Sequence, residues 1–124
     1  MEVKSFRDLA VWQKAMELTS VVYQVTAELP ADERFGLVSQ PRRAAVSVPA
    51  NIAEGHRRSS TKEYLRFLSI AAGSLAELET LLELASGLYS VRTTSQGEVV
   101  GLADEVGKML RAIQQRLEAQ LPHP

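Results

Sequence analysis

Apolar residues recur at steps of three and four along four stretches of this chain, and only short polar segments separate the stretches. In the first stretch, the row of positions runs through Leu9, Trp12, Met16, Thr19 and Tyr23. Such spacing places side chains on one face of an α-helix, whereas a half-buried strand would alternate apolar and polar residues. The pattern therefore predicts an all-α fold.

Four helices are predicted at about residues 7–28, 32–55, 60–89 and 95–120, followed by a frayed tail at 121–124. Capping boxes are predicted near three helix starts: Ser5 with Asp8, Ser60 with Glu63, and Ser95 with Glu98. Short connections of about three to six residues force neighbouring helices to run antiparallel. We therefore expect residues 1–124 to form a single domain, folded as an up-down-up-down four-helix bundle.

Two prolines fall inside the predicted 32–55 helix, which we expect to end at Gly55. Pro41 has no N–H, so the carbonyl of residue 37 would lose its helical donor. We expect residues 31–38 to form a separate helical turn, and Pro41 to begin or kink the helix that follows. Pro49 poses the same question, which is whether the helix is kinked or begins again at the proline.

The 124 residues include no cysteine, which excludes a disulfide framework and a cysteine-based metal site. The N-terminal residues lack the apolar core of a signal peptide, and no window reaches 18 unbroken apolar residues. We expect a cytoplasmic protein that makes no contact with a membrane.

Charge is unevenly distributed along a chain whose net charge is only −1. Residues 34–66 hold seven basic and two acidic residues, a local net charge of +5. Residues 67–107 hold one basic and six acidic residues, a local net charge of −5. The overall charge gives no general attraction to nucleic acid. Either the two segments face each other, or one end of the molecule is positive.

A polar stripe crosses the otherwise apolar 32–55 helix. Its members fall within a band about 60° wide on a helical projection, and they are Gln40, Arg43, Ser47, Asn51, Glu54 and Arg58. The other faces carry mostly apolar or small residues, so we expect another subunit to cover this helix. The 60–89 helix offers Ser74, Glu77 and Glu79 as partners, and we expect Arg43 and Glu77 to form a buried or half-buried pair. Gly73 and Ser74 would let the two helices approach closely.

Three segments, "FRDLAVWQKA", "QPRRAAVSVPANIAEGHRR" and "EYLRFLSIAAGSLAELET", together resemble the four-helix-bundle proteins encoded in intervening sequences of bacterial 23S ribosomal RNA genes. The accessory proteins of diversity-generating retroelements are similar. The resemblance covers about residues 6 to 90, whereas the fourth helix matches only as a pattern. The residues that match the family pattern are Gln40, Arg43, Ser47, Asn51, Glu54, Gly55, Arg58, Gly73, Ser74, Glu77 and Glu79. Pro41 departs from it, because the family usually has an aliphatic residue there.

The resemblance implies a left-handed up-down bundle that assembles as a ring-like homopentamer. It also implies no known enzymatic activity and a suspected role in binding nucleic acid.

The residues that catalysis or metal binding would need are scarce. His56 and His123 are the only histidines. His123 lies in the tail, and His56 lies in a polar turn, where we expect it to be solvated and not catalytic. A di-iron site is suggested by three glutamates, Glu54, Glu77 and Glu79. Bundles that hold di-iron sites use Glu-x-x-His pairs, however, and this sequence lacks them. We therefore expect no enzymatic activity, no cofactor and no metal.

Two functions remain open. The first is a homo-oligomeric scaffold that binds or assembles proteins. The alternative is charge-driven binding of RNA or DNA, because basic residues gather around the turn between the second and third helices. The contacts expected in that case are Arg42, Arg57, Arg58, Lys62 and Arg66. Few exposed aromatic residues are expected there for base stacking.

Overall fold

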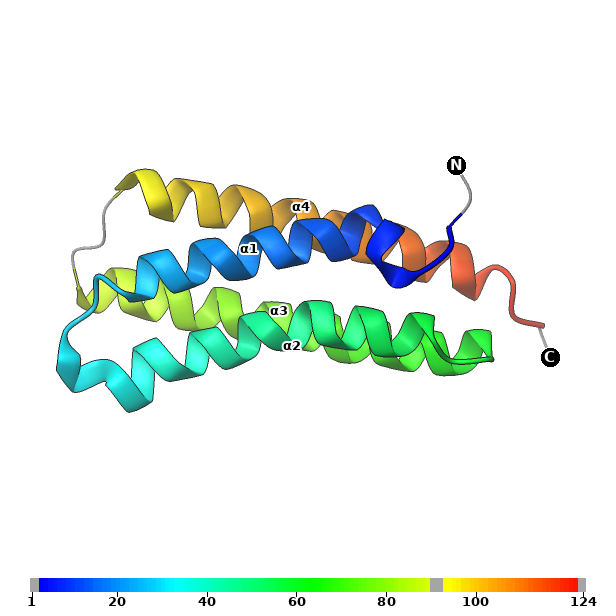
Figure 1. Ribbon diagram of the computed structural model, residues 1–124, viewed down its shortest axis with the longest axis horizontal. Helices are drawn as coiled ribbons and strands as arrows, with labels where there is room; N and C mark the ends of the chain where they lie inside the picture. The colour runs from blue at the N-terminus through cyan, green and yellow to red at the C-terminus, as the bar shows by residue number, and fades with distance from the viewer. Residues whose placement is uncertain (1–2, 90–92, 123–124) are drawn as a thin grey trace.

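The chain is all-helical in the part that the computed structural model describes, which is residues 3–89 and 93–122, with the backbone alone for residues 93–95 (Figure 1). Four long helices are present, as predicted: α1 Ala10–Thr26, α2 Ser39–His56, α3 Thr61–Leu88 and α4 Thr93–Glu118. Three short turns accompany them: η1 Phe6–Asp8 and η2 Ala31–Glu33, both 3-10, and η3 Arg34–Val38, a π-helix.

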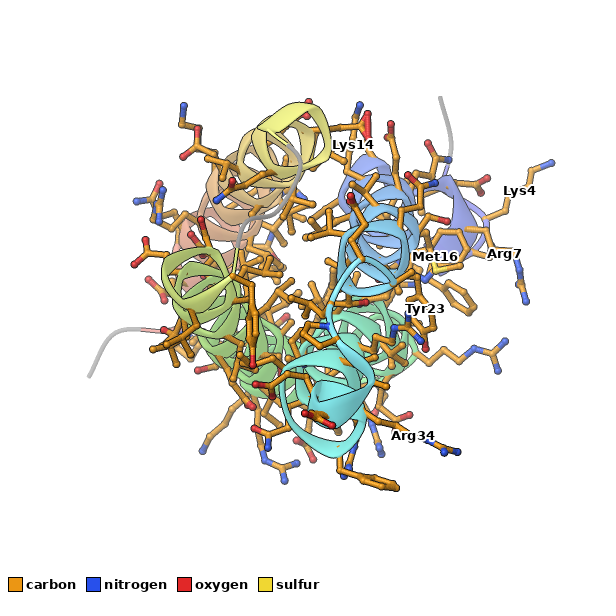
Figure 2. The ribbon with its side chains drawn as sticks, turned by 90° about the vertical axis from the view of Figure 1, so that its left-hand side faces the viewer. Lys4, Arg7, Lys14, Met16, Tyr23 and Arg34 are labelled. Carbon is orange, nitrogen blue, oxygen red and sulfur yellow. The ribbon has the colours of Figure 1, made fainter. Side chains whose placement is uncertain are left out.

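The helices form a bundle in which each lies beside its neighbours in sequence, and α1 also lies beside α4 (Figure 2). The largest fully buried side chains come from all four helices and include Leu18, Ile52, Leu68, Leu78 and Leu110. Each buried aliphatic side chain of this size stabilises the fold by about 1.5–3 kcal/mol relative to an exposed one. At one end of the bundle lie η1, the α2–α3 turn and the end of α4, while η2 and η3 lie at the other (Figure 1).

Two of the predicted capping boxes can be compared with the structure. Ser5 and Asp8 form the expected box, but it caps η1, and α1 begins only after Leu9. The first helix is therefore shorter than the predicted 7–28. The Ser60 hydroxyl accepts a hydrogen bond from the Glu63 N–H at 3.1 Å, which confirms the start of α3. The side chain of Ser95 lies outside the described residues.

The start of the second helix differs from the predicted 32–55. Residues 31–38 form η2 and η3, and α2 begins at Ser39, which places Pro41 in its first turn. N–H groups in the first turn have no acceptor within the helix, so proline loses nothing there. The expectation of a separate turn before Pro41 is therefore confirmed.

Pro49 lies inside α2, and the helix continues through it because another helix supplies the missing donor. Without an N–H at residue 49, the carbonyl of Ala45 has no partner in its own helix. The Thr19 hydroxyl of α1 donates to this carbonyl at 3.1 Å and shares its proton with the Ala15 carbonyl at 2.8 Å. The side chain of α1 thus satisfies a backbone group of α2 at a buried position.

At the other end of the bundle, the connection between α1 and α2 is joined to the end of α3. Tyr89 donates its hydroxyl proton to Glu33 Oε2 at 2.5 Å, and the Leu37 N–H donates to Glu33 Oε1 at 3.2 Å. These hydrogen bonds, that of Tyr89 first, lower the pKa of Glu33 from its usual 4.5. The bond to Glu33 likewise raises the pKa of Tyr89 above 10.0.

Thr19→Val should lower the free energy of unfolding by about 1–3 kcal/mol, because it leaves the buried Ala45 carbonyl without a donor. Pro49→Ala gives residue 49 an N–H for the same carbonyl, so Thr19→Val should cost less in that background. Urea titrations of the four proteins at equal concentration measure this coupling. An equal cost in both backgrounds would contradict the assignment of the hydrogen bond.

The Glu33–Tyr89 contact should make stability depend on pH. Because the pKa of Glu33 is lowered on folding, its contribution is present above about pH 4.5 and is lost as pH falls through the folded value. The raised pKa of Tyr89 has the opposite sign, so the contribution is lost as pH rises above about 10. Thermal melts should show a Tm gap between the wild type and Tyr89→Phe at about pH 7 that narrows at about pH 3. A gap that stays constant would rule out this linkage.

Candidate functional site

Four of the five basic residues expected to contact nucleic acid lie together at one end of the bundle. Arg57 and Arg58 follow directly on α2, and Lys62 and Arg66 lie in the first two turns of α3. All four side chains are exposed. The short turn between α2 and α3 brings them together, as the sequence suggested.

A fifth basic residue reaches the same place from the N-terminal segment. The guanidinium of Arg7 lies 4.6 Å from the centre of the Phe6 ring, and that of Arg57 lies 5.6 Å from it. The Phe6 ring itself packs edge-on against Trp12, with the centroids 5.4 Å apart. We call the five residues Arg7, Arg57, Arg58, Lys62 and Arg66 the basic end.

A second aromatic ring orders the other two arginines. The guanidinium of Arg58 lies 4.7 Å from the centre of the Phe67 ring, and that of Arg66 lies 5.2 Å from it. Each exposed contact of this kind is worth about 0.5–1 kcal/mol. Phe6 and Phe67 therefore each hold two arginines in place. Neither ring was among the residues predicted for this site, although each lies beside an arginine in the sequence.

Carboxylates engage part of the basic end. Arg58 forms an ion pair with Glu54, and Arg66 forms one with Glu63 at 3.4 Å. Among the described residues, Arg7, Arg57 and Lys62 form no ion pair. Exposed ion pairs contribute little, about 0–1 kcal/mol each, so an incoming anion can replace them.

Arg42 does not belong to the basic end. It lies 15 residues before Arg57 along α2, which corresponds to about 22 Å at 1.5 Å per residue. Its Nε donates to the buried Thr26 hydroxyl at 2.8 Å, and its NH2 group donates to the Tyr23 carbonyl at 3.1 Å. A cation at the last carbonyls of α1 is favoured by the helix dipole. Arg42 thus ties α2 to the end of α1.

The polar stripe runs along α2, and only its centre, where it contacts α3, is partly buried. There the Ser47 and Ser74 hydroxyls lie 2.7 Å apart, and the Asn51 amide donates to the Ser47 hydroxyl at 3.0 Å. Further members of the stripe are exposed: Gln40, Arg43, Glu54, Arg58, Glu77 and Glu79.

The expected buried pair of Arg43 and Glu77 is absent from the chain. Both side chains are exposed, and Arg43 donates to the Ser39 hydroxyl at 3.3 Å instead. The two residues lie on the outward sides of their helices, where water solvates both charges. The prediction of a buried pair within one chain was therefore wrong.

Close approach of α2 and α3 depends on Gly55 and not on Gly73. A Cβ added at Gly55 would lie 2.8 Å from Phe67 Cβ and 3.0 Å from Tyr64 Cδ1. A Cβ added at Gly73 would meet no atom within 4 Å. Gly55 also lies within α2 and has no positive φ, so it serves by its size and not by ending the helix.

One histidine, His56, lies among the described residues. His56 packs edge-on against Tyr64, with the ring centroids 5.9 Å apart. Within the described ranges, no three His, Asp or Glu side chains gather where they could hold a metal ion. Across the same residues, no helix has the length and apolar character needed to span a membrane.

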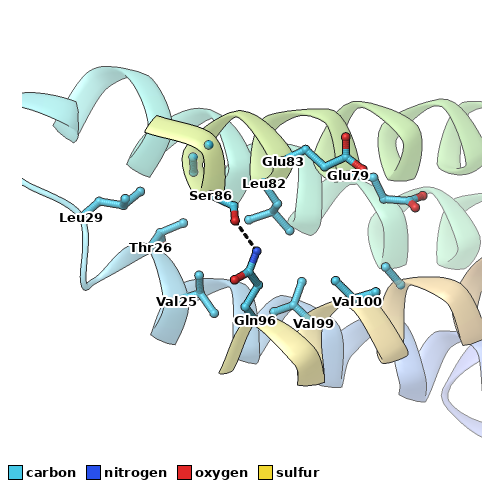
Figure 3. A pocket seen from close by; sticks show the side chains of 13 residues that line it. Val25, Thr26, Leu29, Glu79, Leu82, Glu83, Ser86, Gln96, Val99 and Val100 are labelled. Carbon is cyan, nitrogen blue, oxygen red and sulfur yellow. Dashed lines mark hydrogen bonds between the residues drawn. The ribbon is translucent and has the colours of Figure 1, made fainter. Parts of the chain in front are cut away.

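A cleft of about 390 Å³ opens between α3 and α4 at the end away from the basic end (Figure 3). Its apolar wall comes from three helices: Val25 of α1, Leu82 of α3 and Val99 of α4. The exposed carboxylates of Glu79 and Glu83 also line it, and the Gln96 amide donates to the Ser86 hydroxyl across it. The volume falls within the range of ligand pockets, about 300–1,000 Å³.

These features define a class of small all-helical proteins with a four-helix fold and a basic end. Within that class, residues 7–112 match the profile of the 23S rRNA-intervening sequence protein, so the chain belongs to this family.

Solved structures share the fold, and one of them is a protein of unknown function from the S23 ribosomal protein family of Bacteroides thetaiotaomicron. The two superpose with a TM-score of 0.76 at 24% sequence identity, over 85% of this chain and 98% of the other. No curated protein matched the chain.

Gly55→Ala should destabilise the protein by about 1–3 kcal/mol, because the new methyl group forces Phe67 or Tyr64 to move. Gly107→Ala on α4 is the matched control, since its Cβ would meet only Leu75 Cδ2 at an ordinary 3.5 Å. The control should be neutral or slightly stabilising, because alanine favours helix. Chemical denaturation of both variants measures this difference, and equal effects would contradict the close approach at residue 55.

Proposed function

We propose that this protein binds RNA or DNA through the charge of its basic end and is not an enzyme. The observation that carries the proposal is the pair of phenylalanines, because Phe6 and Phe67 each hold two guanidinium groups at the surface. Stacking on a ring reduces the conformational freedom that an arginine loses when it binds a phosphate. This favours nucleic-acid binding over the scaffold role that the sequence alone suggested.

The chemistry of the basic end favours phosphate contacts over base reading. Guanidinium groups bind phosphate oxygens with two parallel hydrogen bonds, and Lys62 adds a point charge. Contacts of this kind position a nucleic acid but carry no sequence information. We therefore expect strong dependence on salt and little preference for sequence.

Assembly would multiply the effect of one basic end. We propose a left-handed up-down-up-down bundle that forms a ring-like homopentamer in the cytoplasm. Its support is the outer face of α2, where Val46 and Ala50 are exposed in the single chain. Five copies of a modest basic end would bind one polyanion far more tightly than a single copy does.

A protein-binding scaffold is the second candidate, and the cleft between α3 and α4 favours it. Apolar side chains line this cleft, and Val100 at its edge is exposed. A partner with an apolar group and a nearby cation would fit, because Glu79 and Glu83 line the same cleft.

The test is a titration of labelled structured RNA, single-stranded DNA and duplex DNA with the wild type and with Arg7→Glu/Arg57→Glu/Lys62→Glu. The wild type should bind, and its affinity for duplex should fall with salt at a log–log slope of about −0.9 per phosphate neutralised. In the variant, loss of three contacts should make that slope shallower by about 2.7.

The control variant is Lys14→Glu/Lys108→Glu/Arg111→Glu, which changes the net charge by the same amount at residues of α1 and α4 that are not part of the basic end. It should bind nearly as the wild type does. Equal losses in both variants would leave only a general charge effect and would refute the site. No binding of any probe at low salt would refute the function, and nuclease-resistant capture of one protein partner would then favour the scaffold.

A further inference from the structure

The outward side of α3 carries apolar residues that no part of the described chain covers. Ile70, Leu84 and Leu88 are 41%, 51% and 67% exposed. Together with Gly73 and Glu77 they follow helical steps of three, four and seven, so they share one face. We call these five residues the α3 outer face. The opposite side of α3 already packs in the core, so the helix is apolar on two sides.

Gly73 has no role within the chain that the structure shows. A side chain at this position would enter open space. Glycine in the middle of a helix is destabilising relative to alanine, so its presence calls for a reason outside the helix. A second backbone or a bulky side chain that approaches α3 at this point would supply one.

A groove of about 600 Å³ runs between α1 and α2 on another side of the bundle. It is lined by three arginines, Arg34, Arg42 and Arg43, and by the apolar parts of Tyr23 and Val46, among others. Tyr23 and Val46 are 44% and 45% exposed, and no acidic residue lines the groove. Met16, Tyr23 and Arg34 lie on the same side of the molecule in Figure 2. We call the surface lined by Tyr23, Arg34, Arg42, Arg43 and Val46 the α1–α2 groove.

The charges of the two surfaces are complementary. The α3 outer face holds one glutamate, Glu77, and no basic residue, whereas the α1–α2 groove holds three arginines and no acid. Each surface also has exposed apolar side chains beside its charges. Glu77 lies at the middle of the α3 outer face and Arg43 lies in the groove, and both are exposed in the single chain.

We propose that the α3 outer face of one copy docks in the α1–α2 groove of the next copy, with Glu77 of one chain against Arg43 of the other. The proposal rests on the self-assembly proposed above and adds the two surfaces that make it. Gly73 lets the partner approach α3 closely, and Val46 and Tyr23 cover the exposed apolar residues of α3.

The arrangement of the helices determines the shape of such an assembly. The contact joins two different surfaces, so it is heterologous and cannot close as a two-fold dimer through that contact alone. Because α2 lies between α1 and α3, the two surfaces of one copy face different directions (Figure 2). Successive copies therefore turn relative to one another, and repetition of the contact gives a ring where the rotation closes and a helical filament where it does not.

Light scattering coupled to gel filtration tests the proposal on the wild type, Arg43→Glu, Glu77→Arg and the variant that carries both changes. The wild type should show a mass several times the 13.6 kDa of one chain. Each single change places like charges across the contact and should shift the mass toward one chain. The double variant should assemble again.

A mixture of Arg43→Glu and Glu77→Arg separates contacts between chains from contacts within one chain. Every junction between unlike chains in the mixture is complementary, so the two variants should form species larger than one chain when they are mixed, although a ring of five cannot alternate throughout. If the double variant assembles but the mixture keeps the mass of one chain, the two residues pair within one chain. That result would overturn the proposal.

Arg111→Glu and Glu83→Arg are matched controls, because they make the same charge changes outside the two surfaces and should leave the mass unchanged. Gly73→Leu should keep the helical circular dichroism of the wild type, since the chain leaves space there, and should still dissociate the assembly. A wild type that runs as one chain would refute both self-assembly and this interface. A wild type that assembles regardless of Arg43, Glu77 and Gly73 would refute the interface alone.

Discussion

The position of α2 depends on a hydrogen bond between helices, from the Thr19 hydroxyl of α1 to the Ala45 carbonyl that Pro49 leaves without a partner. A proline inside a helix normally bends or ends it, because a backbone acceptor is left over. Here the Ala45 carbonyl accepts a hydrogen bond from Thr19 of α1, and this bond fixes the register of α1 and α2. At its other end, α2 lies so close to α3 that only glycine fits at residue 55. The α2–α3 turn, and with it most of the basic end, is placed by these two contacts.

The basic end also depends on the η1 turn, Phe6–Asp8, which lies against α2. The Ser5–Asp8 capping box closes the η1 turn, and that turn brings Phe6 within reach of Arg57. Binding through charge alone would need only a local excess of basic residues. If the basic end binds phosphate as we propose, the two aromatic rings that orient the guanidinium groups would add to the effect of charge, because the side chains would lose less conformational freedom on binding.

The helical periodicity of the sequence was enough to predict four helices and an apolar core, and Pro41 was enough to predict a break before α2. The basic residues of the α2–α3 turn were also found, since they are close in sequence. Phe6 and Arg7 were missed because they reach that turn only through the fold, from about 50 residues away. The prediction of a buried Arg43–Glu77 pair was wrong for a related reason. Helical spacing gives the face of each residue but not whether that face turns inward or toward solvent.

The carboxylate of Glu33 accepts one hydrogen bond on each of its oxygens and so joins the α1–α2 connection to the end of α3. Its Oε1 atom lies only 2.8 Å from where a Cβ of residue 36 would be. Gly36 has no positive φ, so the need for glycine there is one of space and not of backbone conformation. A substitution at residue 36 would therefore disturb the contact between Glu33 and Tyr89, in which residue 36 itself takes no part. An alanine there would loosen the end of α3, about 50 positions further along the chain, without touching it.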